Sequence, residues 1–100
     1  MRRSAVSLAS STQRDKIRDR CCVNCGEYGC DPAHLTPRSQ GGCDMPDCVI
    51  PLCRTCHTAF DHGLVDLEPV LALAQFREER AHMAWHLSLE QCRRRLRGER

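Results

Sequence analysis

Cysteine is the residue that most constrains this chain, because nine of its 100 residues are cysteines. Four of them form two closely spaced pairs, Cys22-x-x-Cys25 and Cys53-x-x-Cys56. Structural zinc takes four ligands in a tetrahedron, and two such pairs brought together by the fold supply four thiolates. The spacing therefore predicts one four-cysteine zinc site. Cys21 is an alternative to Cys22, although its spacing to Cys25 is less common in a zinc knuckle.

The other cysteines give a weaker pattern. A second zinc site through Cys30, Cys43 and Cys48 is the less favoured interpretation, because no two of them have the spacing of a knuckle. Cys92 is expected on the apolar side of a helix, where it would belong to the core.

The cysteines also bear on the compartment. An odd number of cysteines does not suit complete disulfide pairing. The start, "MRRSAVSLASS", has no apolar run like that of a signal peptide, and no stretch approaches the roughly 20 apolar residues that span a bilayer. We therefore expect an intracellular, cytoplasmic protein, whose reduced thiols favour zinc.

Charge is distributed unevenly along the chain. Residues 1–20 carry six basic and two acidic side chains, and residues 77–100 carry seven basic and four acidic ones. Residues 21–76 carry only two basic side chains against seven acidic ones. Basic ends around an acidic, cysteine-rich centre suit a protein that binds a polyanion and holds cations at its centre. The alternative is that charged ends keep a small protein in solution.

Local signals place the expected elements. Proline and glycine make residues 37–47 a loop, Gly63 ends a helix, Pro69 opens one, and Ser88 with Gln91 forms a capping box. The predicted helices are a short one from Ser11 or Thr12, 54–63, 69–86 and 88–97, and the predicted strands are 33–36 and 48–52.

His57 and Asp61 are four residues apart, so on a helix they lie on one face. An imidazole and a carboxylate there can share one divalent ion and leave positions open for water and phosphate. The alternative is an exposed surface pair. His62 is expected to face solvent, and His82 and His86 are expected to be ordinary polar positions of a later helix.

Three quoted stretches carry a resemblance to a known family. "AHLTPRSQGG", "DCVIPLCRTCH" and "FDHG" together resemble the HNH endonucleases, in the branch with CxxC before the first strand and CxxCH at the start of the helix. The resemblance covers about residues 22–63 and extends to about 67. It implies a small α+β fold: a ββα-metal core stapled by the four-cysteine zinc site and flanked by N-terminal and C-terminal helices. The predicted units are a flexible basic tail (1–11), the HNH domain (12–67) and a helical extension (68–100).

The resemblance also implies residue roles. His34 would be the general base that takes a proton from the attacking water, and His57 with Asp61 would hold the catalytic metal, Mg²⁺, Mn²⁺ or another divalent ion. Ala33 stands where many members have a metal ligand, which leaves Asp31 as a further candidate ligand.

The family's central Asn, which braces the loop between the strands, falls at Cys48 in this chain. Asp47, one residue earlier, is the candidate for that bracing role.

Arginines near the expected site are the candidates for binding phosphate without reading sequence. They are Arg18, Arg20, Arg38, Arg54, Arg93, Arg94 and Arg95. Because aromatic side chains do not alternate with them, the expected partner is duplex DNA.

Three functions fit the sequence. The first is a DNA endonuclease that nicks or cuts both strands, of a kind found in phages and mobile elements, acting alone, as a homodimer or with a phage or host protein. The second is a zinc-ribbon module that binds nucleic acid or protein without catalysis. The third is a redox-sensing zinc–thiolate switch.

Overall fold

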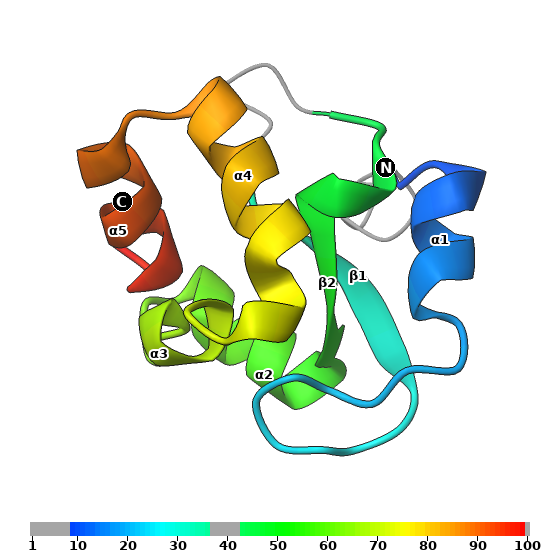
Figure 1. The fold of residues 1–100 in the computed structure, drawn as a ribbon. Helices are drawn as coiled ribbons and strands as arrows, with labels where there is room; N and C mark the ends of the chain where they lie inside the picture. Colours follow the sequence, from blue (N-terminus) through cyan, green and yellow to red (C-terminus); the bar gives the residue numbers. More distant parts are fainter. Residues whose placement is uncertain (1–8, 37–42, 100) are drawn as a thin grey trace, which may run out of the picture.

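Two short antiparallel strands form the centre of the molecule (Figure 1). The computed structural model describes residues 9–36 and 43–99. Strand β1 (Cys30–His34) pairs with β2 (Val49–Cys53) in a register that sets Cys30 opposite Cys53 and His34 opposite Val49. With the helices around it, this sheet makes the protein a small α+β fold, as predicted.

The strand limits differ from the prediction. β1 begins before Ala33, at Cys30, although it contains Pro32, which lies opposite Pro51 of β2. Proline lacks an amide proton and is confined to edge strands, but both strands of a two-stranded sheet are edges and therefore tolerate it. Cys48 belongs to the short 3-10 helix η3 (Pro46–Cys48) rather than to β2.

Helices α1 (Ser11–Ile17) and α2 (Arg54–Asp61) both contact the strands. α1 starts where the sequence predicts, and Ser10 and Gln13 form its capping box. Most of the predicted tail lies outside the described residues. α2 follows β2 directly, and its chain turns away at Gly63, whose φ is +70°.

The prediction of one continuous helix over residues 69–86 is wrong, because the helix is interrupted there. The chain forms α3 (Glu68–Leu71), the 3-10 helix η4 (Ala74–Phe76) and α4 (Arg77–His86). Leu73 is extended at the break, and Arg80 donates to the carbonyls of Leu71 and Leu73, which stabilises it. The break lets Leu71 and Phe76 both reach the core.

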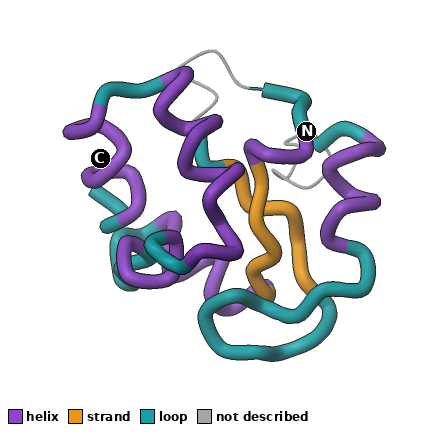
Figure 2. The backbone as a smooth tube through the Cα atoms, viewed as in Figure 1, coloured by secondary structure: helices purple, strands orange, loops and turns teal. Residues whose placement is uncertain are grey.

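Helix α5 (Leu89–Leu96) begins at the predicted capping box of Ser88 and Gln91. In Figures 1 and 2, α4 lies between the strands and α5. A single cluster of buried side chains joins the ββα unit to these later helices. Its members include Leu35, Ile50, Leu52 and Phe60 from the first part and Leu67, Leu71, Phe76, Met83, Leu87 and Leu96 from the second.

One charged pair links α1 to α4 inside the structure. Lys16 Nζ lies 2.6 Å from Glu79 Oε2, and both side chains are almost fully buried. The same ammonium group donates to the carbonyls of Pro46 and Val49, each at 2.8 Å. The charge is therefore paired and hydrogen-bonded, as burial requires.

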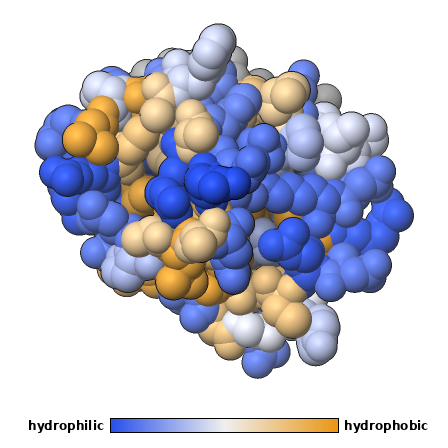
Figure 3. Space-filling model, viewed as in Figure 1, coloured by the Kyte–Doolittle hydropathy of each residue, from blue (hydrophilic) through white to orange (hydrophobic). Residues whose placement is uncertain are grey.

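The surface of the described residues is mixed. Figure 3 shows hydrophilic side chains separating the hydrophobic ones on the face in view. The most exposed large hydrophobic residues, Trp85, Tyr28 and Leu64, come from different parts of the chain. None of the helices in the described residues has the length and apolar character needed to cross a bilayer.

Gly63 and Gly98 meet backbone to backbone where α2 and α5 end. A Cβ on Gly98 would lie 2.6 Å from Gly63 Cα, and the φ of Gly98 is +76°. We therefore expect Gly98→Ala to cost the left-handed penalty plus the cost of overpacking, at least about 2 kcal/mol in the free energy of unfolding.

Gly29→Ala is the matched control, because Gly29 has a φ of +78° but a Cβ added to it would have no atom within 4 Å. Gly29→Ala should lower the free energy of unfolding by about 1 kcal/mol. Urea unfolding of both variants measures the difference. Equal losses would contradict the close contact between the two helix ends.

Candidate metal centre and active site

Four cysteine sulfurs converge at the end of β2. Cys22 and Cys25 come from the turn before β1, and Cys53 and Cys56 come from the junction of β2 and α2. Their sulfur atoms all lie within 4.8 Å of one another, and those of Cys25 and Cys53 are 3.6 Å apart. Sulfurs at about 2.3 Å from a tetrahedral zinc would be about 3.8 Å apart, so the group fits this ion.

The local backbone shapes both pairs for metal binding. Gly26, at φ +84°, donates its amide to the Cys22 carbonyl at 2.9 Å and closes the first turn. Cys53 is the N-cap of α2, and its sulfur accepts a hydrogen bond from the Cys56 amide at 3.4 Å. Sulfur that accepts such bonds is stabilised as thiolate by the positive end of the helix.

The thiol environments differ in how easily they ionise. Burial raises the pKa of Cys22, but hydrogen bonds from the backbone of Cys53, Cys25 and Asn24 outweigh it and lower the pKa to about 7. Asn24 lowers the pKa of Cys56 by donating to its sulfur, yet burial and the neighbouring thiols together raise it to about 12. The crowded sulfurs therefore need a cation before all four can ionise.

Cys21 stands outside this group and is exposed. Cys30, opposite Cys53 in the sheet, donates its thiol to the Glu27 carbonyl at 3.4 Å. Cys92 is half-buried and packs against the core, in the position expected of it.

His57 follows Cys56 on α2 and lies between two carboxylates. Its Nε2 is 3.8 Å from Asp61 Oδ2, and its Nδ1 is 3.7 Å from Asp31 Oδ2. The ring is buried, whereas the Asp61 side chain is 47% exposed. Arg54 Nε donates to the same Asp31 oxygen at 3.0 Å and fixes that carboxylate.

This arrangement orients the imidazole. The ring lies between the two carboxylates at nearly equal distances, with Nδ1 toward Asp31 and Nε2 toward Asp61. One nitrogen and one carboxylate oxygen, partly open to solvent, form a donor set suited to a divalent ion. Asp31 therefore belongs beside the imidazole, and Ala33, which is fully buried, supplies no ligand.

His34 ends β1, and its ring faces α1. Its Nε2 lies 3.2 Å from Gln13 Oε1. The Gln13 amide nitrogen donates to the carbonyls of Cys43 and Met45, so the orientation of this amide is fixed and Oε1 is the acceptor. In a neutral imidazole the proton is then on Nε2, and Nδ1 is the basic nitrogen.

The backbone of His34 is held from α5. Arg95 donates to the carbonyl oxygens of His34 at 2.7 Å and Leu35 at 3.1 Å, and its guanidinium lies 4.7 Å from the centre of the Phe60 ring. Such a stacked, doubly bonded arginine is held firmly in place. Arg95 thus supports the strand end, a contact that the predicted phosphate role did not anticipate.

The other predicted arginines are spread over the surface. Arg20 is exposed, and Arg18 pairs with Asp15 on the exposed face of α1. Arg93 pairs with Glu68 at 3.6 Å, and Arg94 pairs with Glu99 at 3.5 Å. Arg38 lies outside the described residues.

The side chains of His34, His57 and Asp61 do not form one group of closely spaced potential ligands. Among the described residues, two groups of three or more potential ligands have all their ligand atoms within 4.8 Å, and neither contains these three side chains.

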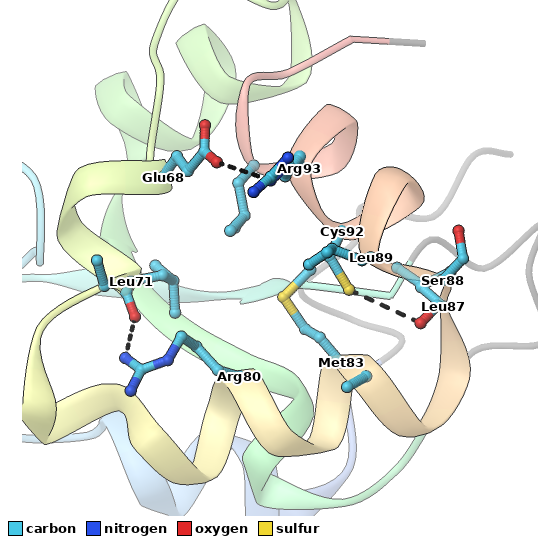
Figure 4. A pocket seen from close by; sticks show the side chains of 12 residues that line it. Glu68, Leu71, Arg80, Met83, Leu87, Ser88, Leu89, Cys92 and Arg93 are labelled. Atoms are coloured by element: carbon cyan, nitrogen blue, oxygen red, sulfur yellow. Dashed lines mark hydrogen bonds and ion pairs between the residues drawn. The ribbon is translucent and has the colours of Figure 1, made fainter.

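A pocket of about 430 Å³ lies elsewhere, between α3, α4 and α5, with Met83, Leu87 and Cys92 in its wall (Figure 4). It is apolar and lined by none of the predicted catalytic residues.

The fold and the cysteine group together define a structural class of protein, a ββα unit with a four-cysteine site that can hold a metal. Residues 21–68 match the family model described as HNH endonuclease, so this segment is similar to the HNH endonuclease family. The resemblance inferred from the sequence is confirmed. No curated protein and no solved structure matches the chain.

Gln13 is a site residue that the sequence interpretation missed. The only local signal was the capping-box spacing of Ser10 and Gln13, which marks the start of α1. That signal locates the helix, but it does not reveal that the same amide reaches a histidine 21 residues later.

Serine substitutions test the metal group. We expect Cys25→Ser to bind one zinc fewer per chain and to melt at least about 10 °C lower, because the free energy of metal binding is folding free energy. Zinc content after dialysis and thermal unfolding measure the two effects. Cys21→Ser, the exposed neighbour, is the control and should keep both values; the opposite ranking would mean that Cys21 is the ligand.

Proposed function

We propose that the protein is a metal-dependent endonuclease that hydrolyses phosphodiester bonds of DNA. The observation that carries this proposal is the position of His57: it follows a cysteine of the metal group and lies between Asp31 and Asp61, within the segment that matches the HNH family model. A buried imidazole held between carboxylates, one of them open to solvent, suits a catalytic ion.

Each residue has a separate task in this proposal. His34, with Nδ1 as its basic nitrogen, takes the proton of the attacking water. His57 and Asp61 hold Mg²⁺, Mn²⁺ or another divalent ion, which when bound neutralises charge on the phosphate and the leaving oxygen. The four cysteines hold a structural zinc that positions α2.

The proposed DNA contacts are electrostatic. Arg54 is 80% exposed and starts α2, three residues before His57, so it can meet a phosphate at the site. Arg18, Arg20, Arg93 and Arg94 are exposed and would bind phosphates farther away. We place Arg38 and Arg95 among the candidate contacts as well, on sequence grounds. Contacts of this kind favour duplex DNA with little sequence preference.

We infer an intracellular setting, where all nine cysteines would stay reduced, as they are in the structure. A phage or mobile element is the context that the family resemblance favours. Cutting both strands with one site per chain would require a homodimer or a partner protein.

A binding module without catalysis is the second candidate. It is favoured by Ala33, which is fully buried and cannot ligate a metal where many family members do. Such a module would bind nucleic acid or protein, and when its partner is DNA the two functions differ only in cleavage.

Histidine variants test the catalytic proposal. The wild-type protein should nick supercoiled plasmid with Mg²⁺ or Mn²⁺, and His34→Ala and His57→Ala should each lower the rate by about 10²-fold or more, since each removes a group required for proton transfer or metal binding. Agarose gels over time measure the rate. His62→Ala, on the exposed end of α2, should cut at the wild-type rate.

Plasmid that stays intact under every metal, while the protein still retards DNA in a gel, would replace the endonuclease with the binding module. If His34→Ala cleaved the plasmid at the wild-type rate, only the assignment of His34 as the general base would be overturned.

Asp31 offers a test of how His57 is oriented. Asp31→Asn should raise the Mn²⁺ concentration needed for half-maximal cleavage by about 10-fold, because partners of a metal-binding histidine tune its affinity. The maximal rate at saturating Mn²⁺ should change less. Asp19→Asn, at an exposed position after α1, is the control; an equal shift in both variants would exclude a specific role for Asp31.

A further inference from the structure

A second group of potential ligands lies on the side of the sheet where η3 meets α4. It consists of Cys43, Cys48, His82 and His86, whose ligand atoms all lie within 4.8 Å of one another. Cys48 ends η3, and the two histidines are one turn apart on α4, which contacts η3. Residues distant in the sequence thus meet at one point.

Two short distances in this group share one atom. His82 Nε2 lies 3.1 Å from Cys43 Sγ and 3.2 Å from His86 Nε2. Zinc at its usual bond lengths separates two nitrogens by about 3.4 Å and a nitrogen and a sulfur by about 3.6 Å. The observed distances are within about half an ångström of these edges.

Ordinary hydrogen bonding explains the cluster less well. Nε2 of a neutral imidazole has either one proton or one lone pair, so it makes one good hydrogen bond and cannot serve Cys43 and His86 equally. The two imidazole rings are edge to face, with centroids 4.9 Å apart; Nε2 of His82 faces the Cys43 thiol, and Nε2 of His86 faces Nε2 of His82. Convergence on a shared centre is the arrangement that a metal requires.

The surroundings also fit a metal. Cys48 is buried, Cys43 and His82 are half-buried, and His86 closes the outer side. The Met45 amide donates to Cys43 Sγ at 3.4 Å, a bond that stabilises a thiolate. Two thiolates and two imidazoles are a set that structural zinc uses.

We propose that Cys43, Cys48, His82 and His86 form a second structural zinc site. The proposed site differs from the sequence interpretation in two respects: Cys30, whose thiol donates to the Glu27 carbonyl, lies outside the group, and His82 and His86 serve as ligands. The ion would join the segment before β2 to α4, close to the carbonyls of Cys43 and Met45 that hold Gln13. The proposal does not depend on the endonuclease function.

Zinc stoichiometry tests this site. Protein purified in reducing buffer should contain two zinc ions per chain by elemental analysis, and the double variant His82→Ala/His86→Ala should contain one. Both histidines lie toward the surface, so the variant should keep its far-UV circular dichroism. The control His62→Ala removes an exposed histidine from the end of α2 and should keep two zinc ions.

Cysteine labelling separates the two sites. In the double variant, iodoacetamide should modify Cys43 and Cys48 at least 10-fold faster than in the wild type, while Cys53 and Cys56 stay protected; peptide mass spectrometry measures this. One zinc ion in the wild type, removed by Cys25→Ser and unaffected by His82→Ala/His86→Ala, would overturn the proposal. So would a double variant that keeps two zinc ions.

Discussion

The junction at Cys53 determines the geometry on which the rest of the site depends. This residue ends β2 opposite Cys30, caps α2 through its sulfur and contributes that sulfur to the four-cysteine group. Cys56, one turn later, contributes a second sulfur, and His57 comes next. A metal bound by these thiolates would therefore fix the angle between β2 and α2 and, with it, the direction of the His57 ring.

The catalytic candidates also depend on elements outside the family segment. Gln13 of α1 sets the tautomer of His34, and Arg95 of α5 holds its carbonyl. Arg95 also lies over Phe60 of α2, so the same side chain contacts both halves of the ββα unit. Helices at both ends of the described chain therefore act as supports for one strand end, and residues 21–68 alone lack them.

Local chemistry made much of the fold predictable. The paired cysteines, the capping box at Ser88 and the glycine at 63 are signals contained within a few residues, and the structure places them as expected. The break at Leu73 was not predictable, because helical spacing over 69–86 is satisfied equally by a straight helix. Tertiary contacts determine the interruption, because Arg80 donates to the carbonyls left free there and Phe76 is buried in the core.

The pairing of Gln13 with His34, and of His82 with Cys43, was hidden for a related reason. Each joins elements that no short motif connects, so only the packed arrangement reveals it. Asp31 was a candidate ligand through the family resemblance alone, because its position before Pro32 gave no sign that the strand would start early enough to bring its carboxylate to His57.

The buried pair of Lys16 and Glu79 has a consequence for the order in which the chain assembles during translation. Glu79 emerges from the ribosome 63 residues after Lys16. The four cysteines at 22–56 all leave the ribosome before it, so they can meet while α4 is still inside the exit tunnel. Until Glu79 arrives, the Lys16 ammonium keeps its water, and α1 lacks the ion pair that holds it against α4. The nascent protein would therefore acquire its metal-stapled centre first and the support for His34 last.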